Sequence, residues 1–353
     1  GGYIISGQRQ LHGGLTITTD SSEVLLIKTD NLGNQQWQQV YGVGVVTDDF
    51  GNSVQQTNDG GYIIYAIKDQ GDLKELWLIK TDNLGNLQWD NTFGSLNFGI
   101  SGLFHMSFGQ QTTDGGYILA GLGDGVIDPN SALGFYHPIK LIKTNSQGDT
   151  SWTQNVLLPN PNHTYMSLSI DKTNNGGYII AGHSATIDTI AHSILYNGFL
   201  IKTDSTGSLV WNKAIGYYGY DAHQTTDGGY ICTGAQDTTP HIMLNKTDAN
   251  GNTTWSKIYT GSGNVYYSSF FGGNVEQTTD GGYITVGTSV DTINSILSVV
   301  LIKTDGNGNI TSTFNIPIPN ANRKLQKVTD LLGRETKQTN QPLFYIYDDG
   351  TVE

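Results

Sequence analysis

Two short phrases alternate along this chain of 353 residues, and this repetition constrains the fold more than any other feature of the sequence. The first phrase is QTTDGGYI or a near copy of it, and its GGY core recurs six times. The second phrase is LIKTDNLGN or a near copy. A tryptophan stands shortly after it in five of six occurrences, and Ser312 takes that place in the sixth. A period of roughly 50 to 60 residues is typical of proteins that repeat one small unit of secondary structure.

Each repeat has the pattern of two β-hairpins joined end to end. In the second repeat, GNSVQQT, YIIYAI, LWLIKT and LQWDNTFG are short runs that contain many β-branched and aromatic residues. NDGG separates the first two runs, and DNLGN separates the last two. Such turns use the positive φ of glycine and the side-chain hydrogen bonds of Asp or Asn. No segment shows convincing helical periodicity.

Four antiparallel strands repeated in this way predict an all-β fold, a β-propeller of about six four-stranded blades. A β-solenoid is the alternative, but its coils are usually shorter and lack paired hairpins. The first blade is expected to lack its leading strand, because the chain starts with GGYI. The predicted propeller domain covers 1–316, with blades at about 1–42, 48–94, 100–158, 164–216, 217–261 and 266–316.

The repeated aromatic and lysine residues are expected to have structural roles. A large apolar ring in a strand normally packs in the interior, so each tryptophan is predicted to lie between blades. The lysine of each LIKT is expected to lay its stem across neighbouring rings. The repeated tyrosines are Tyr62, Tyr117, Tyr178, Tyr230 and Tyr283, and the tryptophans are Trp37, Trp89, Trp152, Trp211 and Trp255.

Strand direction divides the turns of each blade between two faces of the propeller. Because antiparallel strands alternate in direction, the DGG and DNLGN turns share one face, which we call the constant face. The second turn of each blade and the connections between blades lie on the other face, which we call the variable face. Loop length changes there: the stretch from Tyr230 to Lys246 is short, and that from Tyr117 to Lys143 is long. Because variable loops on a rigid scaffold often carry binding sites, we expect a ligand site on the variable face.

Tyrosines, carboxylates and histidines are frequent in the loops of the variable face. Aromatic rings beside carboxylates suit a carbohydrate, because the C–H faces of a sugar stack on rings and its hydroxyls need polar partners. The alternative interpretation is that these tyrosines only cap the ends of strands. The candidate ligand-binding residues are Asp48, Asp49, His183, Tyr217, Tyr218, Tyr220, Asp221, His241, Tyr266 and Tyr267.

Motifs for catalysis and metal binding are sparse. The sequence has no HExxH or GxSxG motif, and we predict no catalytic residue, metal site or required cofactor. Asp48 and Asp49 could supply the two acids of a glycosidase, but neighbouring strand residues point to opposite faces. The DNLGN turns resemble calcium loops superficially. Since they lack the spaced carboxylates and the closing Glu of such loops, we interpret them as structural turns, with calcium as the weaker alternative.

Charge and hydropathy narrow the range of partners. The net charge is −13 at pH 7, which argues against nucleic acid or an anionic membrane as the main partner, because phosphates bind clustered Lys and Arg. No apolar run approaches the ~18 residues of a membrane-spanning helix. Cys232 is the single cysteine, so no intrachain disulfide can form, and its apolar surroundings indicate a buried thiol.

The alternating phrases QTxDGGYIxxG and LIKTDxxGNxxW resemble the repeat propellers of secreted Bacteroidota proteins. After a Pro-broken linker at 317–321, the segment 322–353 contains KVTDLLGRE and PLFYIYDDGTVE. This segment is similar to the C-terminal sorting domain of type IX secretion substrates. Such domains usually end in a basic residue and an apolar strand, so we expect this segment to be clipped, and the N-terminus to be processed or incomplete. The resemblance implies export by the type IX translocon, removal of the signal by its sortase-like peptidase, and a secreted or cell-surface protein.

These features together predict a secreted or cell-surface propeller used for binding or adhesion. Its expected ligand is a glycan, another extracellular polymer or a surface protein, held by the variable face. A glycan-active hydrolase or lyase is the first alternative, and it requires two or more acids that converge in the central funnel. A purely structural surface protein is the second alternative, and it predicts a featureless variable face.

Overall fold

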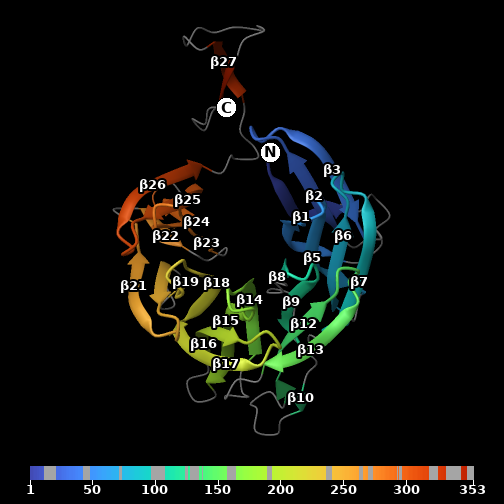
Figure 1. Ribbon diagram of the computed structural model, residues 1–353. Coiled ribbons are helices and arrows are strands. Elements are labelled where there is room, and N and C mark those ends of the chain that lie inside the picture. Colours follow the sequence, from blue (N-terminus) through green and yellow to red (C-terminus); the bar gives the residue numbers. More distant parts are fainter. Residues whose placement is uncertain are drawn as a thin grey trace.

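The computed structural model describes most of the chain as strands and turns around a central opening (Figure 1). In the described parts no helix occurs, and the all-β propeller of six blades expected from the repeat is confirmed. Those parts therefore contain no candidate membrane-spanning helix. The described residues are 1–11, 21–42, 48–70, 74–96, 108–123, 126–127, 135–136, 138–156, 164–188, 193–235, 241–261, 265–268, 273–291, 293, 296–317, 325–330 and 343–347.

Each of the first three blades is an antiparallel sheet whose strands follow one another in sequence order. Blade 1 has three described strands, β1 (Ile4–Leu11), β2 (Ser21–Thr29) and β3 (Gln35–Tyr41). Blade 2 contains β4 (Phe50–Gln56), β5 (Tyr62–Asp69), β6 (Lys74–Thr81) and β7 (Leu87–Leu96). Blade 3 contains β8 (Phe108–Gln111), β9 (Tyr117–Leu122), β12 (Ile139–Thr144) and β13 (Thr150–Val156), with a small hairpin of β10 (Val126–Ile127) and β11 (Phe135–Tyr136) between β9 and β12.

The last three blades repeat this order. Blade 4 contains β14 (Thr164–Lys172), β15 (Tyr178–Asp188), β16 (Ser193–Thr203) and β17 (Leu209–Gly216). Blade 5 contains β18 (Tyr218–Gln224), β19 (Tyr230–Ala235), β20 (Ile242–Thr247) and β21 (Thr253–Tyr259). Blade 6 contains β22 (Val265–Ser268), β23 (Val275–Gln277), β24 (Tyr283–Asp291), β25 (Ile296–Thr304) and β26 (Ile310–Pro317). Outside the blades, β27 (Leu325–Asp330) pairs with β28 (Leu343–Tyr347).

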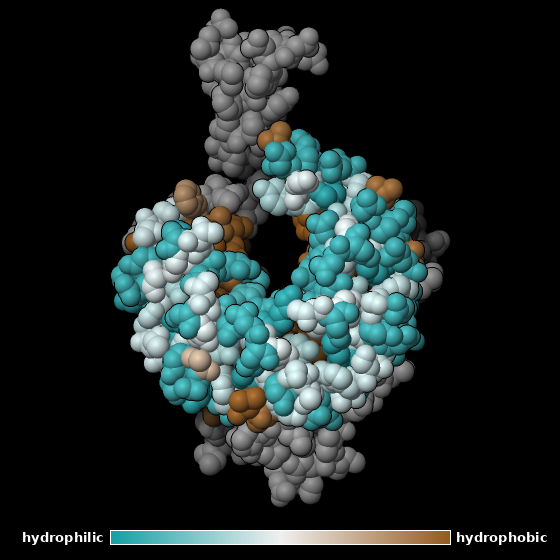
Figure 2. Space-filling view, viewed as in Figure 1, coloured by the Kyte–Doolittle hydropathy of each residue, from teal (hydrophilic) through white to brown (hydrophobic). Residues whose placement is uncertain are grey.

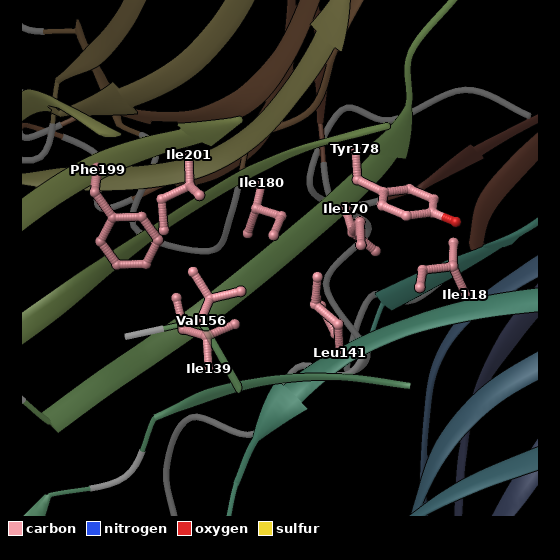
Figure 3. Packing of buried hydrophobic residues seen from close by; sticks show 10 residues of the cluster. Ile118, Ile139, Leu141, Val156, Ile170, Tyr178, Ile180, Phe199 and Ile201 are labelled. Carbon is pink, nitrogen blue, oxygen red and sulfur yellow. The ribbon is translucent and has the colours of Figure 1, made fainter. Parts of the chain in front are cut away.

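The hydrophobic core lies between neighbouring blades, because the sheets on either side cover the two faces of each middle strand. Figure 3 shows Ile118 and Leu141 of blade 3 in one cluster with Ile180 and Ile201 of blade 4, and all four are fully buried. Burying such an aliphatic side chain contributes about 1.5–3 kcal/mol. The first strands of neighbouring blades contact one another around the central opening, and the fourth strands form the outer rim (Figure 1).

The two glycines of the DGG turn meet different steric demands. Gly60 has a φ of 85°, a backbone conformation that other residues resist. A Cβ on Gly61 would lie 2.1 Å from the carbonyl oxygen of Thr81, so this position admits no side chain. Gly115 and Gly116 meet the same two demands in blade 3. The repeated glycine pair therefore lets the first turn pack against the third strand.

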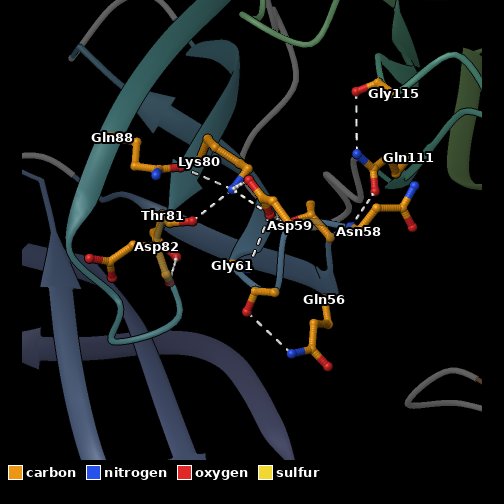
Figure 4. A network of polar contacts seen from close by, with 12 residues as sticks. Gln56, Asn58, Asp59, Gly61, Lys80, Thr81, Asp82, Gln88, Gln111 and Gly115 are labelled. Carbon is orange, nitrogen blue, oxygen red and sulfur yellow. Dashed lines mark hydrogen bonds and ion pairs between the residues drawn. The ribbon is translucent and has the colours of Figure 1, made fainter.

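The glutamine of QTTDGG links blades 3, 5 and 6 each to the preceding blade. The Oε1 atom of Gln111 accepts a hydrogen bond of 2.9 Å from the backbone N–H of Asn58 in blade 2, and its Nε2 donates to Gly115 (Figure 4). Gln224 and Gln277 accept equivalent bonds from the first turns of blades 4 and 5. This phrase therefore sets the contact between blades as well as the turn.

Four of the six repeated lysines form ion pairs with the aspartate of the first turn. The expectation that the lysine stems lie across neighbouring rings stays a prediction. The Nζ atom of Lys80 lies 2.9 Å from Asp59 in the first turn and also donates to the carbonyl of Thr81 (Figure 4). A carboxylate placed beside a nearly buried ammonium group offers a stronger partner than a ring face does. The equivalent pairs in blades 3, 5 and 6 are Lys143–Asp114, Lys246–Asp227 and Lys303–Asp280.

Each repeated tryptophan packs against the GGY tyrosine of the following blade, edge-on in four of the five pairs, and this confirms the predicted position between blades. The ring centroids of Trp89 and Tyr117 are 5.8 Å apart at an interplanar angle of 63°. The other pairs are Trp37–Tyr62, Trp152–Tyr178, Trp211–Tyr230 and Trp255–Tyr283.

Blades 6 and 1 lack this contact. Ser312 replaces the tryptophan, and Tyr3 is 61% exposed, whereas Tyr117 is 1% exposed. We call the uncovered surfaces of Tyr3 and Ser312 the seam.

Candidate functional site

Five aromatic rings gather on the variable face where blade 4 meets blade 5. They are His183 of β15, Tyr196 of β16, and Tyr217, Tyr218 and Tyr220 at the start of blade 5, and we call them the aromatic cluster. Tyr218 lies at its centre: its ring centroid is 4.9 Å from that of His183 and 5.0 Å from that of Tyr196. The ring of Tyr220 stacks on that of Tyr218, with centroids 6.0 Å apart and an interplanar angle of 10°.

Three glycines and a bulge bring these rings together. A Cβ on Gly219 would lie 2.5 Å from the carbonyl oxygen of Gly182, and a Cβ on Gly198 would lie 2.8 Å from the backbone of Tyr218. The absence of side chains therefore lets β18 approach β15 and β16 closely. The pairing of β18 with β19 also shifts at Tyr220, so this residue is the extra one of a β-bulge, a device that often redirects a side chain near a binding site.

His183 is the buried member of the aromatic cluster. Its side chain is enclosed by three tyrosine rings, and Nδ1 lies 3.4 Å from the carbonyl oxygen of Gly219. Burial lowers the pKa of His183 to about 4, although the contact with Gly219 opposes the shift. The ring is therefore neutral at physiological pH. The tyrosines are only partly buried, so the cluster presents uncharged rings and phenol hydroxyls to the solvent.

The sequence prediction found four of the five rings and missed Tyr196. The structure brings His183, Tyr217, Tyr218 and Tyr220 together as one site. Tyr196 lies at the other end of the long second turn of blade 4, opposite Ala185 in the β15–β16 register. A tyrosine within SILYNGFLIKT was the only signal available, and the variable length of that turn hid the proximity of its ring to that of His183.

The candidates Asp48 and Asp49 directly precede β4 in the connection between blades 1 and 2, whereas the aromatic cluster lies where blade 4 meets blade 5. Asp49 is buried and accepts a hydrogen bond of 2.9 Å from the backbone N–H of Asp69, and burial raises the pKa of its carboxyl group. Asp48 is exposed and lies 3.4 Å from the hydroxyl of Ser22, with which it forms an isolated bridge. These two aspartates connect blade 1 to blade 2.

The candidates of blades 5 and 6 are also dispersed. The Nδ1 atom of His241 lies 3.2 Å from the backbone oxygen of Tyr267, whose ring packs against the core between these blades. The backbone of Tyr266 belongs to β22, and its side chain lies outside the described residues. The structure therefore does not join His241, Tyr266 and Tyr267 to the aromatic cluster.

Asp221 belongs to a different group, which lies on the first strands at the central opening. The ring of His223 in β18 lies between Asp171 of β14, at 2.8 Å, and Asp221, at 3.1 Å. Asp221 also accepts a hydrogen bond from the backbone N–H of Val275 in β23. Glu276 approaches the same ring at 4.0 Å. We call Asp171, Asp221 and His223 the ionic staple, because they link blades 4, 5 and 6.

The charge state of the ionic staple limits its chemistry. Burial alone would lower the pKa of His223, but hydrogen bonds from its ring to Asp171 and Asp221 outweigh this effect and raise the pKa to about 11. The ring is therefore a cation at physiological pH, held between two carboxylates. Those carboxylates are engaged in binding the imidazolium, an arrangement that suits cohesion between blades. The sequence offered a signal for this group, since Asp171, His223 and Glu276 occupy the repeat position held elsewhere by Gln55 and Gln110.

The aspartates of the DNLGN turns are used within the turns themselves. The Oδ1 atom of Asp82 accepts hydrogen bonds of 2.8 Å from the backbone N–H groups of Leu84 and Asn86, and Oδ2 accepts one from the Asn86 amide. Across the described residues, no group of three or more His, Cys, Asp and Glu side chains is placed to hold a metal ion.

The fold and the aromatic cluster define a six-bladed propeller with a candidate binding surface. No protein-family model matches the chain, and no curated protein matches its sequence. A protein of unknown function from Dyadobacter fermentans is similar in structure, with a TM-score of 0.50 and 11% identity over 76% of this chain and 82% of the other. This likeness shows the fold alone.

Two further solved structures have lower similarity. A protein of unknown function from Bacteroides caccae has a TM-score of 0.46 and 11% identity, over 88% of this chain and 94% of the other. An endo-arabinase from Bacteroides thetaiotaomicron has a TM-score of 0.36 and 9% identity, over 83% and 87%. The neighbours thus include Bacteroidota proteins of unknown function and a carbohydrate-active enzyme.

Proposed function

We propose that this propeller binds an uncharged extracellular glycan through the aromatic cluster. The observation that carries the proposal is the packing of Tyr218 between His183 and Tyr196 on the variable face. Tyrosine rings held by their neighbours supply rigid contact area at a low cost in conformational entropy. Their hydroxyls both donate and accept hydrogen bonds, as sugar hydroxyls require.

Charge supports a neutral ligand over an acidic one. His183 is neutral at physiological pH because burial lowers its pKa to about 4. The aromatic cluster therefore offers no cation to pair with a uronate or sulfate group. The net charge of −13 would also repel a polyanion over the whole surface. Neutral hexose or pentose polymers are the class that these observations favour.

Affinity electrophoresis of the full chain in gels containing neutral polysaccharides tests this function. Tyr218→Ala should weaken binding at least tenfold, because it removes the ring that contacts the other members of the cluster. Tyr218→Phe keeps the ring and should retain most of the affinity, and Tyr3→Ala, which removes an exposed tyrosine elsewhere, should change nothing. Equal retardation of Tyr218→Ala and the native protein would exclude the aromatic cluster as the site.

We also propose that the segment 322–353 directs export by the type IX machinery, so that the protein is secreted or displayed on the cell surface. The separate hairpin of β27 and β28, outside the six blades, supports a role distinct from that of the propeller. Deletion of 322–353 should leave the protein in the periplasm of a host that has this machinery. Normal export of the shortened chain, measured in culture medium and surface fractions, would rule the proposal out.

A further inference from the structure

The constant face carries clefts between neighbouring blades, and one lies between blades 3 and 4. It has a volume of about 400 Å³. Asp114, Lys143 and Trp152 of blade 3 line one side, and Tyr178 and Ser205 of blade 4 line the other. This volume falls within the range of pockets that bind small ligands, about 300 to 1,000 Å³.

A second cleft, between blades 5 and 6, is built from the same repeat positions except in the DNLGN-type turn, where Asn307 follows the position equivalent to Ser205. It has a volume of about 530 Å³. Asp227, Lys246 and Trp255 of blade 5 line one side, and Tyr283 and Asn307 of blade 6 line the other. The two clefts therefore share an aspartate–lysine pair, a tryptophan, a tyrosine and a polar residue of the DNLGN-type turn.

The aspartate of each cleft is an exposed hydrogen-bond acceptor, and a buried lysine balances its negative charge. The side chain of Asp114 is 64% exposed, whereas that of Lys143, 2.8 Å away, is 9% exposed. Burial alone would raise the pKa of Asp114, but hydrogen bonds from Lys143 and Thr112 hold it at about 2. Asp227 has the same geometry with Lys246 and the same lowered pKa. Each carboxylate is thus ionised at physiological pH, yet its pair with lysine carries no net charge.

The tryptophan of each cleft supplies a complementary donor. Within the part of the chain that the structure describes, the indole N–H groups of Trp152 and Trp255 have no hydrogen-bond acceptor, and both rings are only partly buried. Trp77, in contrast, donates its indole N–H to Asp90 at 2.8 Å. An aromatic surface, an ionised acceptor and an indole without an acceptor among the described residues therefore line one neutral cleft.

We propose that these clefts are repeated binding sites for neutral hexose units of a polysaccharide, separate from the aromatic cluster on the opposite face. Sugar hydroxyls would donate to the aspartate and accept from the indole, and the apolar face of the sugar would pack on the rings. The aspartate–lysine pair has no net charge, so an ionic ligand gains little from it. Similar sites spaced around one ring suit a polymer with repeated units, because simultaneous contacts raise the effective affinity.

Tryptophan fluorescence of the full chain distinguishes these clefts from the aromatic cluster. Five of the six tryptophans lie between blades, and the aromatic cluster contains none. Titration with a mannan, a β-glucan, an arabinoxylan and a dextran should change the emission with at least one polymer. Trp152→Phe combined with Trp255→Phe should reduce that change, because both cleft indoles are removed.

Asp114→Asn combined with Asp227→Asn removes both acceptor charges while keeping side-chain size. Blade 4 carries Asn175 at this position, so the turn accepts asparagine. The double variant should bind at least fivefold more weakly in the fluorescence titration. Unchanged affinity, or no emission change with any of the four polymers, would overturn the proposal.

The proposed sites on the two faces can be excluded independently of each other. If Tyr218→Ala abolishes binding in the gels and the polymers leave tryptophan emission unchanged, the clefts are excluded and the aromatic cluster stands. If Tyr218→Ala has no effect and the double aspartate variant loses affinity, the clefts stand and the aromatic cluster is excluded.

Discussion

The Nδ1 atom of His223 lies 2.8 Å from the Oδ2 atom of Asp171, and this contact joins the first strands of blades 5 and 4 at the central opening. Asp221 holds the other ring nitrogen and also accepts a hydrogen bond from blade 6. The imidazolium ring and its two aspartate partners thus link three blades. A propeller with no disulfide relies on such contacts between blades, beyond the hydrophobic core, to keep them in register.

Replacing His223 should lower stability in a pH-dependent way. The folded-state pKa of His223, about 11, exceeds the ordinary value of 6.5. Its contribution is therefore complete below pH 6.5 and is lost as the pH rises through 11. His223→Gln, which copies Gln55 and Gln110 at the same repeat position, should lower the melting temperature clearly at pH 6 and much less near pH 11. A similar loss at both pH values would contradict the proposed charge state.

The buried His183 should make the fold sensitive to acid. Its folded-state pKa of about 4 is below the ordinary 6.5, so the unfolded chain binds a proton that the folded chain excludes between these values. Stability should therefore fall as the pH drops from 6.5 towards 4. His183→Asn should flatten this part of the profile, measured by urea unfolding at several pH values. A profile unchanged by the substitution would show that His183 titrates normally.

Blade 4 should be stabilised by restoring an aspartate in its first turn. Lys202 is buried and, without an aspartate at position 175, donates to the carbonyl of Thr203, and burial lowers its pKa. Asn175→Asp should give Lys202 the partner found in four other blades and raise the free energy of unfolding by about 0.5–1 kcal/mol. Asp114→Asn is the reverse change and should lower it by a similar amount. Both values come from urea titrations, and a loss on Asn175→Asp would refute the role assigned to the pair.

Removing one inter-blade tryptophan should destabilise the propeller strongly. Trp89 packs against Tyr117, and a Cβ on Gly148 would lie 2.6 Å from its ring. Trp89→Ala should cost about 2–4 kcal/mol, because the cavity cannot fully collapse between two sheets. Leu84→Ala, at a nearby exposed turn position, should change stability by less than about 0.5 kcal/mol. Comparable losses for the two variants, measured by thermal unfolding, would argue against this packing role.

The fold was accessible from the sequence because its determinants are local and repeated. DGG and DNLGN specify the turns, and the alternation of apolar runs specifies the strands. The position of Trp89 between blades followed from its size and its place in a strand. The partner of Lys80 could not be predicted in this way. Whether its ammonium group contacts a ring or Asp59 depends on how two turns meet in space.

The candidate site could be predicted from the sequence only in part, for the same reason. Loop composition pointed to Tyr218 and His183, but Tyr196 reaches them only through the register of a long hairpin. Asp221 was assigned to the ligand site, whereas the structure engages it with His223 at the central opening. The clefts of the constant face were missed altogether, because they arise where two blades meet and neither blade alone forms them.

Blades 1 and 6, which meet at the seam, have fewer tryptophan–tyrosine contacts than the four blades between them. Blades 2 to 5 each have a tryptophan–tyrosine contact on both sides, whereas blades 1 and 6 have one on a single side. At the seam this contact is missing, because Tyr3 is 61% exposed and Ser312 takes the place of a tryptophan. Repeat proteins open locally where contacts between neighbouring units are fewest, so local unfolding of the described blades should begin beside Tyr3 and Ser312 and reach blades 3 and 4 last.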